Sequence, residues 1–256
     1  ARLRSVCDMP IVEGADRVLN WITKEKGKFA PLLGISLKNL EMKSLSAEKI
    51  SVPENPFELT REEAKVIGTE NDENDIIWLG YYNEPRLIYT APAFKKGPWK
   101  ASNRRTVHIA IDVFANKGTK LYAPMEGEVF TAEYRDSPLD YGGVVILKHT
   151  TPDNDEFFTL YGHLDPKFLD ALQVGDKIDK GQEFCKLGGP DVNGGWAPHV
   201  HFQIAMTTDG MEADWPGVAD PDDLDFWNSV CPNPASMLNL EDHDCVYNVN
   251  KKTEVL

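Results

Sequence analysis

The sequence predicts a mainly β protein built around an antiparallel sheet, and three observations support this fold class. Apolar and polar residues alternate over residues 107–113, which is the pattern of a strand with two different faces. Residues 200–204 form a short β-branched and aromatic run that again indicates a strand. Between residues 96 and 208, turn signals that contain glycine recur at short intervals, at 126–127, 142–143, 175–176 and 180–181.

Composition divides the chain into three parts. We expect residues 1–95 to form an N-terminal extension of mixed α and β structure, residues 96–208 the β domain, and residues 209–256 an acidic C-terminal strap. The strap is rich in Asp and Pro, but its aromatic residues favour packing on the domain over disorder. We assign no chemistry to the N-terminal extension.

Local patterns predict several elements within the extension. Residues 14–30 place apolar side chains at the spacing of an amphipathic helix. A capping-box pattern predicts a second helix over residues 56–67. Residues 76–82 and 86–90 are typical of two strands joined by a turn.

The charge of the chain restricts its partners. The formal net charge is −14, and residues 187–250 contain eleven Asp or Glu but no Lys or Arg. Such a field disfavours nucleic acid and anionic membranes, so we expect no nucleic-acid partner. A solvated acidic surface and a docking face for a basic partner both stay open. The longest apolar runs have four or five residues, as at 144–147, so no membrane span is expected.

The cysteines give limited information. No two of Cys7, Cys185, Cys231 and Cys245 form a C-x-x-C pair, which argues against a cysteine-based zinc site. Cys185 lies among apolar residues and is predicted to be a buried thiol. A bridge between Cys231 and Cys245 stays open. This usage favours a reducing compartment over an oxidising one.

Histidines concentrate the usable chemistry, since five of the six lie between residues 108 and 201. His199 and His201 are two apart on a predicted strand and therefore share a face. His108 and Asp112 are four apart and share a face if residues 107–113 form one strand. A mixed set of His and carboxylate suits Zn²⁺, which accepts N and O ligands and keeps an open position in catalytic sites.

Other polar and aromatic residues have simpler interpretations. His149 follows an apolar strand and is interpreted as structural, whereas His243 has no partner pattern and receives no role. Trp196, at the end of a glycine-rich loop, is either a substrate contact or part of the core. Tyr81 and Tyr89 either approach the site or pack between strands.

The order of the histidine motifs resembles that of M23-type (LytM/lysostaphin-like) zinc metallopeptidase domains. The matching stretches are HIAID (108–112), GTKLYAPMEGEV (118–129), YGGVVILKH (141–149), LYGHL (160–164), VGDKIDKGQ (174–182) and HVHFQI (199–204). The resemblance implies that the β domain is a LytM-like antiparallel metallopeptidase core.

The resemblance also implies a role for each motif residue. His108, Asp112 and His201 match the three zinc ligands of the family. His163 and His199 match its two catalytic histidines, which take a proton from water or donate to the tetrahedral oxyanion. Which of the two performs which step stays open.

The activity implied is that of a zinc-dependent endopeptidase acting on a peptide or peptidoglycan-like substrate. Ala110 stands where the family usually has Gly in H-x-G-x-D, which bears on the substrate class more than on metal binding. Two alternatives stay open. One is a non-catalytic metal-binding or regulatory module within a larger fused enzyme. The other is a histidine phosphocarrier, which uses two histidines without a metal.

The parts outside the β domain resemble the central region of large fused proteins, in which an M23-type module lies between a kinase-like phosphotransferase domain and a class III aminotransferase. This implies adjacent fused domains and a cytoplasmic location. The first residues, ARLRSVCDMP, lack the apolar core of a secretory signal. They also lack an initiator Met, so a secreted or cell-envelope location stays open.

Overall fold

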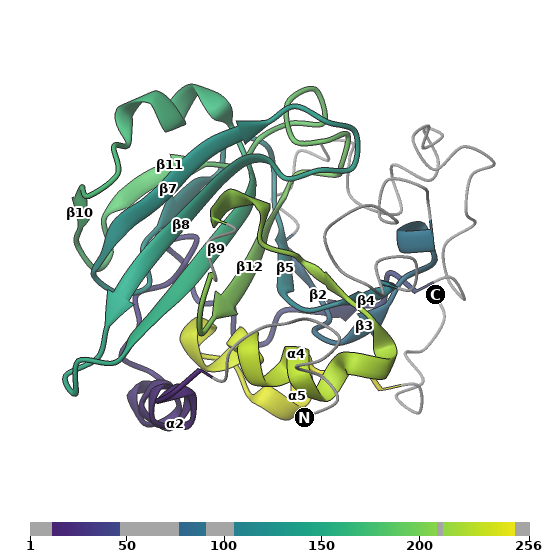
Figure 1. The fold of residues 1–256 in the computed structure, drawn as a ribbon. Helices are drawn as coiled ribbons and strands as arrows, with labels where there is room; N and C mark the ends of the chain where they lie inside the picture. The colour runs from purple at the N-terminus through teal and green to yellow at the C-terminus, as the bar shows by residue number, and fades with distance from the viewer. Residues whose placement is uncertain (1–11, 47–76, 91–104, 209–211, 249–256) are drawn as a thin grey trace.

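A curved antiparallel sheet dominates the computed structural model, which describes residues 12–46, 77–90, 105–208 and 212–248 (Figure 1). Its eight strands follow the order β1-β2-β5-β12-β9-β8-β7-β10. Every neighbouring pair is antiparallel except β1 with β2. The predicted fold class, mainly antiparallel β, is confirmed.

The strands of this sheet differ greatly in length. They are β1 (Met42–Lys43), β2 (Trp78–Gly80), β5 (Ile111–Phe114), β7 (Gly127–Arg135), β8 (Gly142–Thr150), β9 (Glu156–Leu164), β10 (Lys177–Ile178) and β12 (His199–Ala205). A two-stranded sheet pairs β6 (Lys120–Tyr122) with β11 (Glu183–Lys186), and a three-stranded sheet has the order β13 (Val218–Ala219), β4 (Val107–His108), β3 (Glu84–Pro85).

The core lies against the long central strands. Nearly all of β8, β9 and β12 is buried, because both faces of this part of the sheet are covered. Ile146, Tyr161 and Phe202 are among the largest fully buried side chains. The turn between β8 and β9 needs a left-handed residue, and Asn154 supplies it at φ 63°.

The predicted N-terminal helix is present as α2 (Ala15–Glu25), which packs through Val18 and Ile22. Figure 1 shows α2 beside the turn between β8 and β9, and an ion pair of 2.6 Å joins Arg17 to Asp155 in that turn. The extension then contributes β1 and β2 to the edge of the large sheet, where β2 pairs with β5. The predicted helix over residues 56–67 lies outside the described residues.

Two predicted strands are wrong in detail. Residues 107–113 do not form one strand, because β4 pairs with β3 and β13 whereas β5 pairs with β2 and β12. Alternation along the chain carries no information about these partners. Residues 86–90 are not a strand either. A 3-10 helix occupies Leu87–Thr90, and Tyr89 N donates to Arg86 O at 3.1 Å to close its turn.

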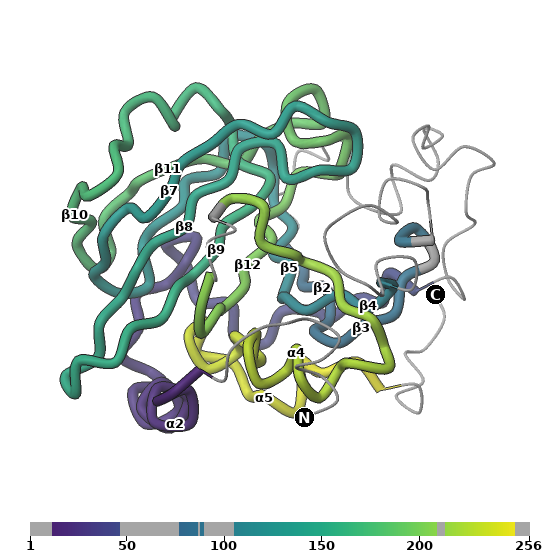
Figure 2. The backbone as a smooth tube through the Cα atoms, viewed as in Figure 1, coloured from purple at the N-terminus to yellow at the C-terminus, as the bar shows by residue number. Residues whose placement is uncertain are grey.

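The acidic C-terminal strap packs on the β domain as expected. It contains α4 (Leu224–Val230), α5 (Asp242–Cys245) and short 3-10 helices at Glu212–Asp214, Pro221–Asp223 and Pro234–Leu238. Trp215 and Trp227 are buried, and β13 of the strap pairs with β4. In the view of Figure 2 the strap crosses in front of β5 on its way to α4.

The sulfur chemistry is simple in the described part of the chain. Cys231 and Cys245 are free thiols, so the bridge left open by the sequence does not form. Cys185 is buried and free, as predicted. The division of the chain at residues 95 and 208 stays a prediction.

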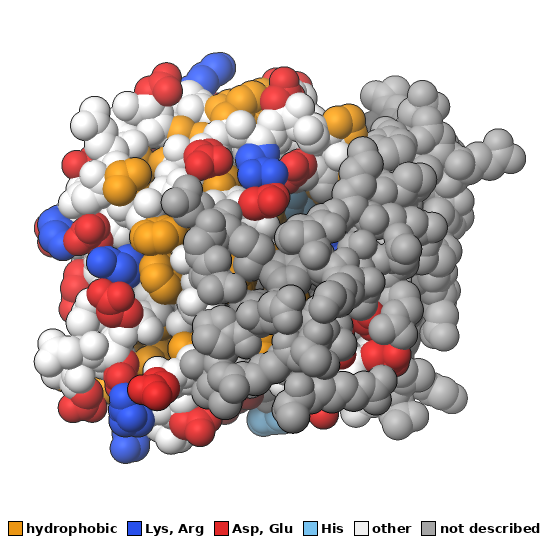
Figure 3. Space-filling view, in the orientation of Figure 1, with side chains coloured by type: hydrophobic (Ala, Val, Ile, Leu, Met, Phe, Trp, Pro, Cys, Tyr) orange, Lys and Arg blue, Asp and Glu red, His pale blue; other side chains and the backbone are white. Residues whose placement is uncertain are grey.

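The surface carries charges of both signs. On the face in Figure 3, Lys and Arg side chains lie among Asp and Glu side chains. Ion pairs of the structure include Lys177 with Glu128 and Lys148 with Glu156. Among the described helices, none has the length and apolarity needed to span a bilayer.

Candidate metal centre

Three short pieces of backbone bring the predicted ligands together. Asp112 on β5 is the direct cross-strand partner of His201 on β12. His108, on β4, reaches the same point from the three-stranded sheet across the bend at residues 109–110. All three side chains are buried. Although the single strand 107–113 was wrong, His108 and Asp112 still meet.

The three side chains turn one atom each toward a common centre. His108 Nε2 lies 3.1 Å from His201 Nδ1 and 3.1 Å from Asp112 Oδ1, and His201 Nδ1 lies 3.5 Å from the same carboxylate oxygen. Tetrahedral Zn²⁺ with bonds of about 2.0–2.1 Å separates its ligand atoms by about 3.3 Å. The observed separations fit such an ion.

The far side of each imidazole fixes its tautomer. His108 Nδ1 faces the Tyr81 carbonyl at 3.2 Å and donates to it, and His201 Nε2 donates to Gln203 Oε1 at 2.8 Å. Each ring therefore presents a lone pair inward. Asp112 Oδ1 is buried without a hydrogen-bond donor. Three lone pairs at such distances repel one another unless a cation lies between them, so these residues fit a divalent metal.

The other carboxylate oxygen of Asp112 has a fixed partner. Arg86 Nη1 donates to Oδ2 at 2.7 Å, and Arg86 Nε donates to Glu84 Oε2 at 2.9 Å. Both Arg86 and Glu84 are buried. Burial alone would raise the pKa of Asp112, but the charged Arg86 beside it holds this pKa well below its ordinary value. The carboxylate is therefore ionised and ready to bind a cation.

The two remaining histidines of the motifs lie beside the ligands. His199 Nε2 lies 3.7 Å from Asp112 Oδ1, and the ring centroids of His163 and His199 are 4.3 Å apart. His163 Nδ1 donates to Asn193 O at 3.0 Å, and His199 Nδ1 donates to Ala197 O at 2.6 Å. Both rings consequently keep a lone pair on Nε2.

A bulge in β9 aims His163. Between the pairs Val145 with Tyr161 and Gly143 with Leu164, β9 has one residue more than β8. His163 takes the left-handed conformation there, at φ 66°, which is uncommon for a residue with a side chain. Bulges of this kind redirect side chains next to functional sites.

Burial keeps the imidazoles of His108, His163 and His199 neutral. It lowers the pKa of His108 to about 3, with Arg86 contributing, and it lowers the pKa of His199. Burial and the neighbouring His199 and His201 hold the pKa of His163 well below its ordinary value. Neutral imidazoles are the form that binds metals and accepts protons.

The other candidate residues divide as follows. His149 lies outside the centre, with ring nitrogens 2.7 Å from both Glu126 O and Thr159 Oγ1, which agrees with a structural role. His243 is exposed and lies 3.5 Å from Asp244. Tyr89 stacks on His108 with ring centroids 6.3 Å apart, so it does approach the site.

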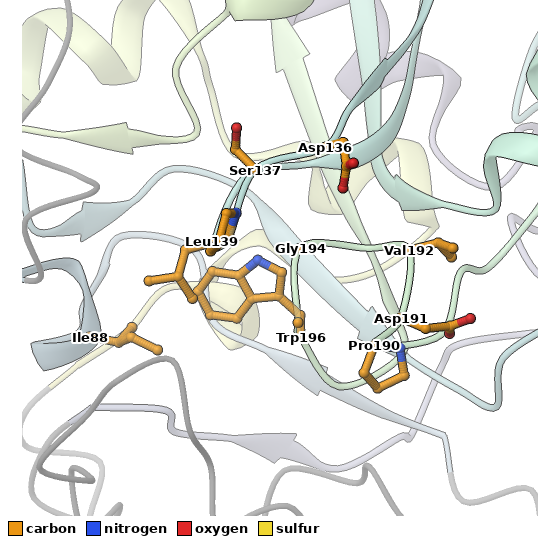
Figure 4. Close-up of a pocket in the computed structure, with 11 residues that line it drawn as sticks. Ile88, Asp136, Ser137, Leu139, Pro190, Asp191, Val192, Gly194 and Trp196 are labelled. Atoms are coloured by element: carbon orange, nitrogen blue, oxygen red, sulfur yellow. The ribbon is translucent and has the colours of Figure 1, made fainter.

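A cavity of about 310 Å³ is lined by Trp196, and neither His163 nor His199 is among its lining residues. Figure 4 shows the indole of Trp196 among its lining residues, with the carboxylates of Asp136 and Asp191 at the edge. The Trp196 ring centroid is 5.8 Å from that of His163 and 6.5 Å from that of His199. Trp196 thus both packs on the site and faces open space.

Sequence reasoning missed Glu84, Arg86 and Gln203. Gln203 carried a signal, because it is two residues beyond His201 and so shares its strand face. Glu84 and Arg86 are the two charged residues of the segment 77–90, and they come from the extension to which no chemistry was assigned.

A buried set of two histidines and one carboxylate, flanked by two neutral imidazoles, fits a metal ion on this antiparallel β fold. Residues 106–213 match the family model of Peptidase family M23. This match covers less than half of the chain and agrees with the resemblance that the motifs carry.

Three solved structures illustrate the similarity of this segment to known proteins. The catalytic domain of lysostaphin from Staphylococcus simulans is 26% identical, with 46% of this chain and 79% of that chain covered and a TM-score of 0.34. Csd3 of Helicobacter pylori is 25% identical over 38% of this chain and 23% of that chain, with a TM-score of 0.30. A zinc containing peptidase from Vibrio cholerae is 22% identical, with 48% of this chain and 36% of that chain covered and a TM-score of 0.33. Among curated proteins, none matches the chain.

Proposed function

We propose that the chain is a zinc-dependent endopeptidase that hydrolyses an amide bond of a peptide or peptidoglycan-like substrate. One observation carries the proposal. His108, Asp112 and His201 turn three ligand atoms toward one point, and these atoms all lie within 4.8 Å of one another. The match of residues 106–213 to Peptidase family M23 supports the same chemistry.

Zinc suits this set better than other common divalent ions. Two imidazoles and one carboxylate are a ligand combination of catalytic zinc sites, which leave a position open for substrate or water. Magnesium and calcium prefer sets made of oxygen alone. When bound, Zn²⁺ lowers the pKa of water from about 15.7 to about 7 and polarises a carbonyl.

The chain's own residues supply the proton transfers. His163 and His199 each hold a proton on Nδ1 through a backbone carbonyl and keep Nε2 free. Either can accept a proton from water at Nε2 and pass it to the leaving amine. Once protonated, the same nitrogen can donate to the developing oxyanion. Side chains that are nine-tenths or more buried keep bulk water from these atoms.

Metal content tests the centre. We expect about one zinc per chain in the purified protein by elemental mass spectrometry. His201→Ala should lose it, because only two ligands remain. His243→Ala is the matched control, since this exposed imidazole lies outside the centre, and it should keep the metal. No zinc in the parent chain, even after zinc is added, would remove the proposal and favour the phosphocarrier.

Hydrolysis then separates an enzyme from a regulatory module. We expect cleavage of Gly-rich peptides or peptidoglycan fragments that a chelator stops and zinc restores. His163→Ala should keep its zinc and lose most of the cleavage, because His163 supplies no ligand in the proposal. A zinc-loaded parent chain that cleaves none of these substrates would favour a non-catalytic metal-binding module.

For the location, we propose the cytoplasm. Cys185, Cys231 and Cys245 are free thiols, as is usual in reducing compartments. Fused neighbouring domains stay a prediction.

A further inference from the structure

A buried chain of three charges lies behind the metal centre. Glu84, Arg86 and Asp112 are linked by hydrogen bonds of 2.9 Å and 2.7 Å, and their side chains are at most 5% exposed. Burying charges is costly unless each is paired and hydrogen-bonded. Apolar side chains of the same size at these three positions would stabilise the fold equally well. Stability alone therefore does not explain why the three charges are buried here.

Arg86 leaves one carboxylate oxygen of Asp112 for the site. Its Nη1 occupies Oδ2, while Oδ1 faces the histidines without a donor. The guanidinium is planar and rigid, and it is held at Nε by Glu84. It therefore fixes the plane of the Asp112 carboxylate as well as its charge.

Glu84 is itself anchored from a third segment. Its Oε1 accepts from Ser44 Oγ and Leu45 N, both at 2.8 Å, and its Oε2 accepts from Arg86. Glu84 also cancels the positive charge of Arg86. Without it, a buried cation next to Asp112 would repel the metal ion.

Gly80 leaves room for this arrangement. It lies opposite Asp112 on β2, and a Cβ added there would lie 3.1 Å from Arg86 Nη2 and 3.3 Å from Asp112 Cβ. A side chain at residue 80 would press on both partners of the ion pair.

We propose that Arg86, anchored by Glu84, is a positioning residue for the metal centre, which holds Oδ2 of Asp112 so that only Oδ1 is offered to the cation. The inference rests on the metal site of the proposed function. It adds that residues outside the segment matched by the peptidase family set the coordination of the ion.

The test uses metal binding by the full chain and does not depend on activity. Glu84→Gln/Arg86→Met removes one negative and one positive charge, so the net charge around the site is kept. Only the hydrogen bond from Arg86 to Asp112 Oδ2 is lost. Glu84→Gln alone keeps the hydrogen bond from Arg86 to Asp112 Oδ2 but leaves the positive charge of Arg86 without a compensating carboxylate. Arg17→Met is the control, because it breaks the exposed ion pair with Asp155, which involves no residue of the metal centre. Zinc affinity is measured by competition with a chromophoric chelator, and coordination by visible absorption of the Co²⁺ form.

We expect the double variant to bind zinc roughly 10–100-fold more weakly, as is typical when a partner of a metal ligand is lost. Its Co²⁺ absorption should weaken, because a carboxylate free to bind through both oxygens raises the coordination number. Glu84→Gln should weaken affinity while keeping the shape of the Co²⁺ spectrum. Arg17→Met should match the parent in both.

Parent affinity and an unchanged Co²⁺ spectrum in both test variants would overturn the inference. If the double variant fails to unfold cooperatively, Glu84→Gln decides, and unchanged zinc affinity there would equally overturn it. A parent chain that binds neither metal would sink the proposed function as well. If the parent binds zinc and the variants bind it equally well, only the proposed role of Arg86 is wrong.

Discussion

Each ligand of the centre has one polar atom facing inward and another held by a partner. The partners are the Tyr81 carbonyl for His108, Arg86 for Asp112 and Gln203 for His201. Such outer contacts set the tautomer and orientation of a ligand, so their loss weakens binding even though the ligand remains.

Gln203 offers a direct check at this scale. Gln203→Met keeps the volume but removes the acceptor of His201 Nε2, so the imidazole can rotate or change tautomer. We expect zinc affinity to fall roughly 10–100-fold, measured by chelator competition. Gln173→Met, at an exposed position, should bind zinc as the parent does. Equal affinities in all three proteins would show that Gln203 does not orient the ligand.

His149 predicts how stability responds to acid. Burial lowers its pKa from 6.5 to about 4, so the unfolded chain binds a proton before the folded chain does. The stability that His149 contributes is complete above pH 6.5 and is lost toward pH 4, at up to about 1.4 kcal/mol per pH unit.

His149→Gln should therefore lose less stability on acidification than the parent does. In urea unfolding of the metal-free proteins at pH 7, 6 and 5, the gap between the two free energies of unfolding should narrow as the pH falls. For His243→Gln, which changes an exposed imidazole, the difference from the parent in the free energy of unfolding should be the same at all three pH values. A constant gap for His149→Gln would contradict the expected titration.

At the scale of elements, small irregularities place the site. The bulge in β9 turns His163 inward, and the break between β4 and β5 sends His108 and Asp112 into two different sheets. The helix α2, by contrast, has regular amphipathic geometry and is held mainly by its apolar face. Its ion pair with the β8–β9 turn is largely exposed on the Arg17 side, so solvent screens this interaction and it adds little to stability.

Replacing one residue on each face of α2 separates these contributions. Ile22→Ala should destabilise the protein by about 2–5 kcal/mol, because this side chain is fully buried and its removal leaves a cavity. Leu19→Ala is the matched control on the exposed face and should change the free energy of unfolding by about 0.5 kcal/mol or less. Chemical denaturation measures both. Equal losses would mean that α2 does not dock through Ile22.

At the scale of the whole molecule, the site is assembled from segments far apart in the chain. The extension supplies Glu84 and Arg86, the peptidase segment supplies the five motif residues, and Gly217 of the strap leaves space for His201, where an added Cβ would lie 2.8 Å from Cε1. An unfolded chain cannot offer such a site, so metal binding must favour the folded state.

Zinc should therefore stabilise the entire fold. At free zinc one hundred times its dissociation constant, the gain is about 2.7 kcal/mol, and a chelator should lower the melting temperature reversibly. Differential scanning calorimetry with and without chelator measures the shift. His201→Ala should melt at one temperature in both conditions. If the chelator does not change the melting temperature of the parent, the site does not bind a metal.

The sequence by itself determined the fold class and the amphipathic helix, because alternation and helical spacing are local properties of the chain. It also singled out the five motif residues, whose roles stay predictions. Residues 107–113 mark its limit: the alternation was real, but the pairing partners of Val107 and Ile111 lie elsewhere in the chain. Only the tertiary structure decided that Arg86 and Glu84 meet Asp112, that Cys231 and Cys245 stay apart, and that His163 sits on a bulge. These features depend on contacts between distant segments, and no local pattern records which segments will meet.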